Sequence, residues 1–166
     1  MQLSRADEGR VESERELLQV AALLQDVVAG MQPLAEERGI RLALGILEEG
    51  VVLGDLAQLI LVLMNLVDNA LIYTPRGGQV MLSSQRTEAQ IAITVQDTGM
   101  GIAPADLPHI FERFYRADLA RRHATGGSGL GLAIVRSLVE AHQGTVTVDS
   151  APGVGSRFLI LLPLVG

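Results

Sequence analysis

The sequence LAQLILVLMNLVDNALIY, residues 56–73, has the apolar spacing of a buried helix and carries two amides, Asn65 and Asn69. They are the only asparagines in the chain. Four residues apart, they share one helix face at a separation of about 6 Å along the axis. A buried amide is costly without a hydrogen-bonding partner. The pair is therefore either a ligand site or a structural amide network, and the spacing alone favours neither.

Two glycine-containing motifs follow, at residues 97–101 (DTGMG) and 127–132 (GSGLGL). At the end of a strand, Asp97 can accept a hydrogen bond from the adenine amine, and Gly99 and Gly101 let the backbone approach a flat ring. A glycine-rich helix start attracts phosphate. Each motif alone is weak evidence, because the first resembles an ordinary turn and the second matches neither a P-loop nor a dinucleotide fingerprint. Their order, together with the amide pair, indicates a pocket for magnesium and a nucleotide.

Composition excludes several other classes of site. The chain has 166 residues, 48% of them hydrophobic, which fits one compact domain. A net charge of −6 argues against a nucleic-acid-binding surface. The absence of cysteine excludes disulfides and zinc–thiolate sites. All 13 basic residues are arginine, so phosphate recognition must use guanidinium groups, backbone N–H groups and a metal ion rather than lysine.

Hydrophobic periodicity predicts alternating helices and strands in a single domain without repeats. Helices are predicted at residues 21–38, 56–73 and 129–142, and strands at residues 17–20, 41–46, 51–53, 79–84, 90–96, 145–149 and 156–162. Asp55 is a good N-cap for the second helix, which ends before Pro75. Residues 98–128 show no strong periodicity, which is typical of a functional lid or of a disordered insert.

The ordered motifs resemble the ATP-binding catalytic domain of bacterial sensor histidine kinases, in the superfamily of gyrase, heat-shock chaperone and mismatch-repair ATPases. Residues 65–73 are similar to the N box, 97–101 to the G1 box, 111–114 to the F box and 127–132 to the G2 box. The resemblance covers roughly residues 17–163. It implies an α/β fold, a two-layer sandwich in which a mixed, mostly antiparallel sheet of about five strands packs on three helices, with a flexible ATP lid.

The resemblance also divides the chain and assigns roles to residues. Residues 1–16 are expected to be the tail of a dimerisation helix or a linker, and residues 17–166 the catalytic domain, with its lid at about 98–128. Asn69 is expected to bind Mg2+, Asn65 to bind phosphates, Asp97 to read the adenine amine, and Tyr73 to pack near the base. The remaining expected nucleotide contacts are Gly99, Gly101, Gly127, Gly129, Leu130 and Gly131.

Four residues bear on catalysis by the same resemblance. Arg113 and Arg116 are expected to steady the transferred phosphoryl group, although for each singly a solvated lid surface is nearly as good an interpretation. Asn65 stands where ATP-hydrolysing relatives carry a glutamate that activates water. An amide cannot take a proton, so Asn65 is assigned a catalytic role that favours transfer over hydrolysis. Ile72 stands where many members have a basic residue, which is expected to weaken nucleotide binding.

The predicted function is transfer of the γ-phosphoryl group of ATP to a histidine on a separate dimerisation domain, with a response regulator as the next recipient. None of the three histidines has the phosphoacceptor motif, so the chain is interpreted as a catalytic fragment. We expect the isolated chain to be a monomer that contacts neither nucleic acid nor membrane. Its expected location is the cytoplasm, and this would also hold for the cytoplasmic part of a membrane-bound sensor. The alternatives are an anti-sigma-factor-type serine kinase, a non-catalytic nucleotide-binding module and, least favoured, a hydrolytic ATPase.

Overall fold

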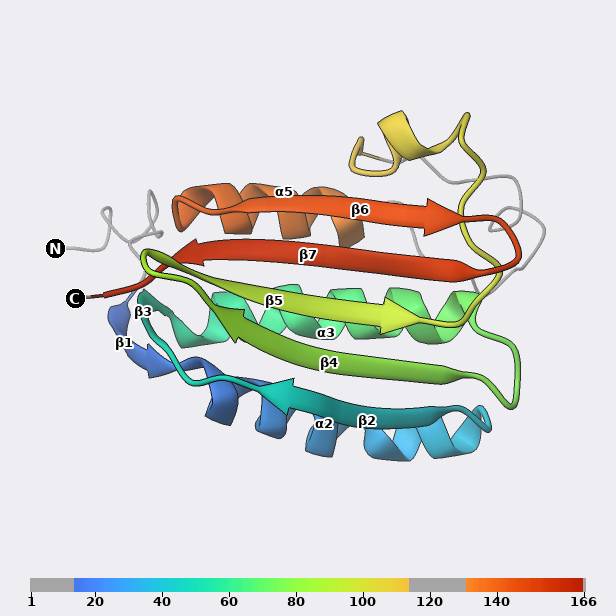
Figure 1. The fold of residues 1–166 in the computed structure, drawn as a ribbon, viewed down its shortest axis with the longest axis horizontal. Coiled ribbons are helices and arrows are strands. Elements are labelled where there is room, and N and C mark those ends of the chain that lie inside the picture. Colours follow the sequence, from blue (N-terminus) through green and yellow to red (C-terminus); the bar gives the residue numbers. More distant parts are fainter. Residues whose placement is uncertain (1–13, 114–130, 166) are drawn as a thin grey trace, which may run out of the picture.

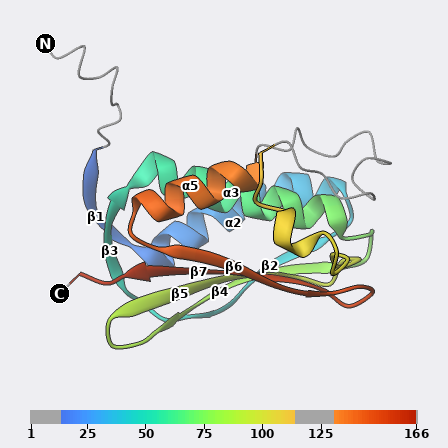
Figure 2. The same ribbon diagram turned by 90° about the horizontal axis from the view of Figure 1, so that it is seen from above.

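The computed structural model describes residues 14–113 and 131–165, which form two layers. One layer is a five-stranded sheet and the other consists of the helices α2, α3 and α5, all on the same face of that sheet (Figures 1 and 2). The predicted two-layer α/β sandwich with a mixed sheet on three helices is confirmed. The core lies between the layers, where apolar side chains from both are buried.

The three helices each bury one apolar stripe. They are α2 (Val20–Glu37), α3 (Leu56–Tyr73) and α5 (Gly131–Ala141). The predicted bounds of α3, residues 56 and 73, are both confirmed. At its start, the Asp55 carboxylate accepts a hydrogen bond from Gln58 N at 3.0 Å and caps the first turn. By length and composition α3 could cross a membrane, but its buried stripe packs inside this domain. It is the core helix of the sandwich.

The large sheet has the strand order β2-β4-β5-β7-β6. Its strands are β2 (Arg41–Leu47), β4 (Gln79–Arg86), β5 (Gln90–Asp97), β6 (Thr145–Ala151) and β7 (Gly155–Pro163). Only the β2–β4 pair is parallel, and the other three pairs are antiparallel. The pairing of β5 with β7 places Asp97 opposite Ser156, so the end of β5 meets the start of β7.

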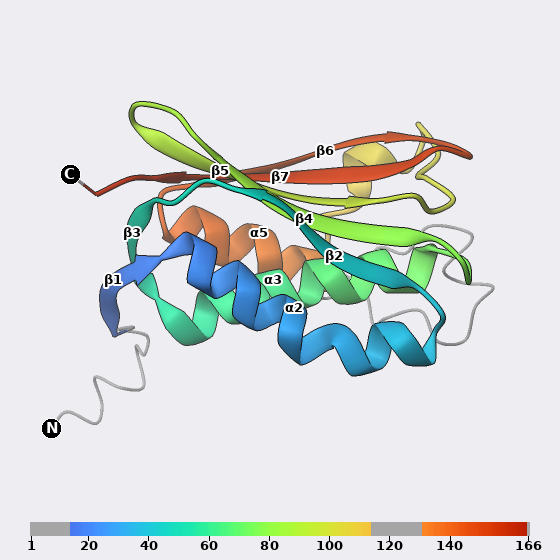
Figure 3. The same cartoon turned by 60° about the horizontal axis from the view of Figure 1, so that its bottom comes forward.

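A separate two-stranded ribbon closes one end of the molecule. It pairs β1 (Arg15–Gln19) with β3 (Val51–Asp55) in antiparallel register, with Leu17 opposite Leu53. The strands predicted before and after the turn at residues 48–50 therefore belong to different sheets. In Figure 3 the ribbon lies at the start of α2 and α3, at the end of the molecule away from the turn between β6 and β7.

The segment between β5 and α5 contains one short helical piece among its described residues, the 3-10 helix η1 (Leu107–His109). Its far end is anchored by Phe111, whose ring contacts that of Phe158 edge-on, with centroids 6.2 Å apart. Phe158 is a buried β7 residue. Residues 98–113 are thus held against the sheet at both ends, above the turn between β6 and β7.

Candidate functional site

Asp97 is the one carboxylate buried within the described residues, with a side chain aligned by two backbone donors. Its Oδ1 accepts hydrogen bonds from Gly99 N at 2.8 Å and from Ser156 N at 3.2 Å. Within the described part of the chain, its Oδ2 accepts none. A buried carboxylate oxygen without a partner is costly, so Oδ2 is suited to an N–H donor of a ligand.

Burial raises the pKa of Asp97 above its ordinary value, and the hydrogen bonds from Gly99 and Ser156 oppose that shift. The three causes differ in origin, since burial penalises the charged form whereas the two backbone donors favour it. A ligand that supplied one further donor to Oδ2 would favour the charged form as well. The electrostatics of the site therefore match an exocyclic amine better than a carbonyl oxygen.

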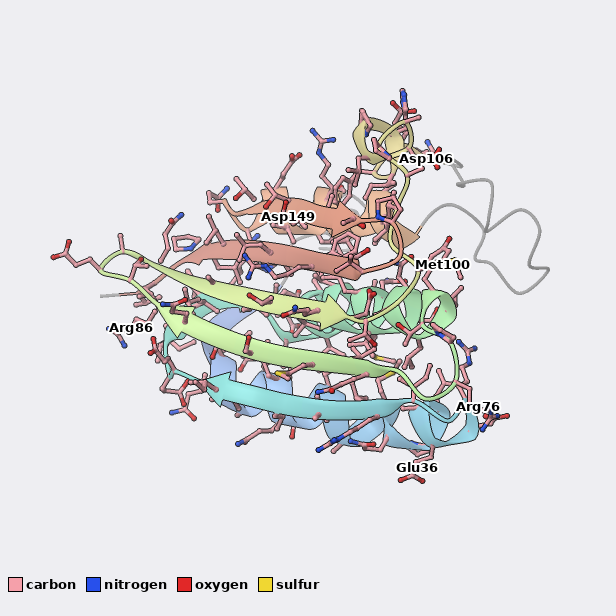
Figure 4. All side chains as sticks on the ribbon, turned by 45° about the vertical axis from the view of Figure 1, so that its right-hand side comes forward. Glu36, Arg76, Arg86, Met100, Asp106 and Asp149 are labelled. Carbon is pink, nitrogen blue, oxygen red and sulfur yellow. The ribbon has the colours of Figure 1, made fainter. Side chains whose placement is uncertain are left out.

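The backbone after Asp97 is bound to the end of α3. Met100 N donates to the Tyr73 carbonyl oxygen at 3.1 Å. Gly99 packs so closely on the same carbonyl that an added Cβ would overlap it. These contacts join the end of α3, the helix that carries Asn65 and Asn69, to the loop that follows Asp97. Figure 4 shows Met100 just beyond the tip of β5.

The same loop also rests on the turn between β6 and β7. Gly101 has φ +78°, a left-handed conformation that favours glycine, and a Cβ there would overlap the Ala151 carbonyl oxygen. Gly153 N donates to Met100 O at 2.8 Å. Ile102 N donates to Ser150 Oγ at 2.8 Å. The loop therefore has a defined path from β5 across the edge of the sheet.

The predicted amide pair lies on a half-buried face of α3 that looks toward the start of α5. Asn65 Nδ2 donates to Leu61 O at 3.0 Å, which leaves Oδ1 without a partner among the described residues. A Cβ added to Gly131 would lie 3.2 Å from that Oδ1. The Asn69 amide makes no hydrogen bond within the same residues. Two amide oxygens are therefore available on one side of the site.

The donor set fits magnesium better than a metal that needs many protein ligands. Among the described residues there is no group of three or more His, Cys, Asp or Glu side chains that could hold a metal ion. Mg2+ commonly takes only one or two protein oxygens and fills its other positions with water and phosphate. Asn69 and Asn65 offer such oxygens, so the residues present fit Mg2+ that arrives with a nucleotide.

The remaining predicted residues are placed only in part. Tyr73 is half-buried at the end of α3, and Arg113 is exposed two residues after Phe111. Ile72 is half-buried near the end of the same helix. Four predicted residues lie outside the described residues: Arg116, Gly127, Gly129 and Leu130.

Sequence reasoning missed the contribution of the turn between β6 and β7. Ser156 N bonds Asp97, and Ser150 bonds the loop after it. Strands at residues 145–149 and 156–162 are predicted from the sequence, and the hairpin that they form places Ser150 opposite Ser156. A serine pair across a tight hairpin was therefore a visible signal, but the pairing of β7 with β5 that brings it to Asp97 was not.

The ribbon end holds a second polar cluster that the sequence did not reveal. His142 contacts Leu138 O through Nδ1 at 2.8 Å and accepts from Asp55 N through Nε2 at 3.1 Å. Arg15 donates to Ala141 O at 2.9 Å. The end of α5 is thereby tied to the start of α3 and to β1, far from Asp97.

Comparison with known proteins gives consistent results. Residues 54–166 match the family model described as Histidine kinase-, DNA gyrase B-, and HSP90-like ATPase. The chain is 42% identical over 161 residues to Sensor histidine kinase CusS of Escherichia coli O6:H1, covering 97% of this chain and 33% of that protein. It is 54% identical over 112 residues to Sensor-like histidine kinase SenX3 of Mycobacterium bovis, covering 68% of this chain and 27% of that protein. The chain thus spans about a third of the relatives' length or less.

Solved structures show the same likeness. Full-length ShkA in complex with AMPPNP matches with a TM-score of 0.81 and 33% identity, over 93% of this chain and 32% of that one. The mycobacterial sensor histidine kinase MprB matches with a TM-score of 0.76 and 28% identity, over 91% of this chain and 98% of that one. The similarity extends over nearly the whole described fold.

Proposed function

Because the chain belongs to the histidine kinase-, gyrase B- and HSP90-like ATPase family and is the ATP-binding catalytic domain of a sensor histidine kinase, we propose that it transfers the γ-phosphoryl group of bound ATP to a histidine on a separate dimerisation domain. A response regulator would receive the group next. We place the domain in the cytoplasm, as part of a longer sensor protein.

The observation that carries the proposal is the Asn65 amide. Its Oδ1 has no partner among the described residues and faces Gly131, where α5 begins within the G2 box. An amide can hold and orient a phosphate or a metal-bound water but cannot remove a proton from an attacking water. Asn65 therefore supports nucleotide positioning without activating hydrolysis, which keeps the phosphoryl group for another acceptor.

Each residue of the site has a task in this proposal. Asp97 Oδ2 would accept from the adenine amine, and the backbone of Gly99 and Gly101 would lie along the ring. Asn69 and Asn65 would hold Mg2+ and the phosphate oxygens. When bound, Mg2+ would neutralise charge that develops on the phosphates during transfer. The chain's own part is to orient the nucleotide and to exclude water, with no covalent enzyme nucleophile.

The arginines beyond Phe111 complete the site in the proposal. Phe111 packs against Phe158 of β7, so the backbone two residues before Arg113 is held against the sheet. A guanidinium group there could reach forward with fixed donors to a phosphoryl group whose charge spreads over its oxygens. Arg116 is proposed for the same role. Residues 98–128 would act as the lid that brings these groups to the nucleotide.

The test is phosphotransfer from γ-labelled ATP to the histidine-bearing dimerisation domain of the same full-length protein, supplied separately. Wild type is expected to label that domain in an acid-labile form that depends on Mg2+. Asn69→Ala removes a metal ligand and is expected to lower the transfer rate by about 10- to 100-fold. Gln58→Ala, an amide truncation near the other end of α3, is the matched control and should keep wild-type transfer.

The outcomes separate the rival functions as well. Label that survives acid would indicate serine as the acceptor and contradict the histidine assignment. ATP analogue binding with no transfer to any histidine domain would indicate a non-catalytic module. Full transfer by Asn69→Ala would show that the amide pair does not hold the metal, and the proposed site would be wrong.

A further inference from the structure

We propose that Ser150 is a positioning residue for adenine recognition, because its hydroxyl fixes the two backbone segments that align Asp97. The inference rests on the proposed role of Asp97 as the acceptor for the adenine amine. Ser150 lies on β6, the edge strand, and its hydroxyl group would not itself touch the nucleotide. Its effect would pass through the loop after β5 on one side and the start of β7 on the other.

The Ser150 hydroxyl group makes three contacts with two different segments. Oγ accepts from Ile102 N at 2.8 Å, which holds the loop that follows Gly101. Oγ also donates to Gly155 O at 3.1 Å and lies 2.9 Å from Ser156 Oγ. The loop and the hairpin are thus joined at one oxygen atom.

The direction of each hydrogen bond follows from the number of protons. A serine hydroxyl has one proton and two acceptor sites. The carbonyl of Gly155 can only accept, so the Ser150 proton goes to it, and both acceptor sites then serve Ile102 N–H and the Ser156 hydroxyl proton. All three positions of the Ser150 hydroxyl are filled. This saturation fixes the orientation of the Gly155–Ser156 peptide as well as that of the loop.

The fixed peptide is the one that aligns the carboxylate. Ser156 N donates to Asp97 Oδ1 at 3.2 Å, and Gly155 packs so closely on the Asp97 carbonyl oxygen that a Cβ would overlap it. On the other side, Gly99 N holds the same Oδ1 at 2.8 Å. The orientation of Oδ2 therefore depends on two segments that meet at Ser150.

Removing the hydroxyl group would loosen both segments at once. In Ser150→Ala, Ile102 N–H and the Ser156 hydroxyl lose their partner, and Gly155 O loses its donor. The loop would still be held by Gly153 N at Met100 O, 2.8 Å, so the fold is expected to survive. The variant is expected to change the orientation of Asp97 Oδ2. The site would then distinguish an exocyclic amine from a carbonyl oxygen less well.

The experiment compares the affinity of the whole chain for ADP with that for IDP, in which a carbonyl oxygen replaces the adenine amine. Wild type is expected to prefer ADP, and Ser150→Ala is expected to lose about two- to tenfold of that preference. A general loss of stability would weaken the binding of ADP and of IDP equally and leave the ratio of the two affinities unchanged. Ser150→Thr keeps the hydroxyl group and is expected to restore the wild-type ratio.

Ser84→Ala is the matched control. Ser84 is a buried serine whose hydroxyl donates to Glu48 O at 2.8 Å. It lies toward the far end of β4 from Val80, the residue that pairs with Asp97. It should lower stability about as much as Ser150→Ala and leave the ADP:IDP ratio as in wild type. A Ser150→Ala protein with the wild-type ratio would overturn the inference alone. A wild type with no preference for ADP would overturn both the inference and the proposed role of Asp97.

Discussion

At the scale of single residues, the site depends on groups whose folded environment is unfavourable without a ligand. Among the described residues, buried Asp97 has one carboxylate oxygen without a partner, and the side-chain amide of Asn69 makes no hydrogen bond. Residues kept in such surroundings usually serve binding rather than stability. A change that removes the ligand interaction should therefore cost little stability, and this distinguishes them from core residues.

Asp97→Asn tests that distinction. The amide in this variant would keep an Oδ1 acceptor for Gly99 N and Ser156 N but would offer an N–H donor where Oδ2 stands. Losing a charged acceptor worth roughly 1.5–3 kcal/mol should weaken ADP binding by about 10- to 150-fold, measured by calorimetry.

The raised pKa also predicts how the stability of this variant compares with that of wild type. The pKa of Asp97 is raised in the folded state, so the folded state binds more protons and stability falls as pH rises from 3.8 through the folded pKa. Once the pH exceeds the folded pKa of Asp97, the cost of burying the charge is present, and the neutral amide of the variant removes it. Urea denaturation at pH 7 should find the variant at least as stable as wild type. A clear loss of stability would contradict a binding role for this carboxylate.

At the scale of elements, α3 and α5 are tied at the end of the molecule away from the nucleotide. His142 is buried and neutral, because its Nε2 must accept from Asp55 N while Nδ1 donates to Leu138 O. Burial lowers the pKa of His142; the Leu138 carbonyl and the Asp55 carboxylate raise it, and the Arg15 charge lowers it further. One imidazole thus connects the last turn of one helix to the N-cap of the other.

This connection predicts a loss of stability in acid. Because the folded pKa lies below 6.5, the unfolded chain binds more protons as pH falls from 6.5 toward the folded value, and stability is lost over that window. Protonated Nε2 cannot accept from Asp55 N, a hydrogen bond worth about 0.5–1.5 kcal/mol. Urea midpoints between pH 5 and 8 should fall in acid for wild type and change less for His142→Gln. Equal slopes for both proteins would rule out His142 as the source.

The bounds of single helices can be predicted from the sequence, whereas the pairing of strands cannot. The bounds of α3 follow from local signals, an N-cap at Asp55 and a stop before Pro75, and both are confirmed. The pairing of β3 with β1 rather than with β2 depends on contacts between residues far apart in sequence. Local signals carry no information on such pairing. For the same reason the N and G1 boxes were predictable, whereas the pairing of β7 with β5 that brings Ser156 opposite Asp97 was not.

At the scale of the whole molecule, nucleotide binding should stabilise the entire sandwich, because the site joins α3, β5 and the hairpin of β6 and β7. With an ATP analogue and Mg2+ at 100 times the dissociation constant, linkage adds about 2.7 kcal/mol. For a domain of this size, that corresponds to a rise in Tm of about 5–11 °C. At the same concentration, Asp97→Asn with its roughly 10- to 150-fold weaker binding would gain only about 0.3–1.4 kcal/mol, so differential scanning calorimetry should find a clearly smaller rise in Tm than in wild type. An equal rise in both would place the nucleotide elsewhere.

The pairing of β5 with β7 has a consequence for biosynthesis. Asp97 and Ser156 are separated by 59 residues, so a ribosome that has completed β5 still needs about 3–12 s to make the strand that aligns the carboxylate. Until then the chain can form α2, α3 and part of the sheet, but its adenine acceptor has only one of its two backbone donors. A nascent chain of this protein is therefore expected to reach its full affinity for an adenine nucleotide only after β7 has paired with β5.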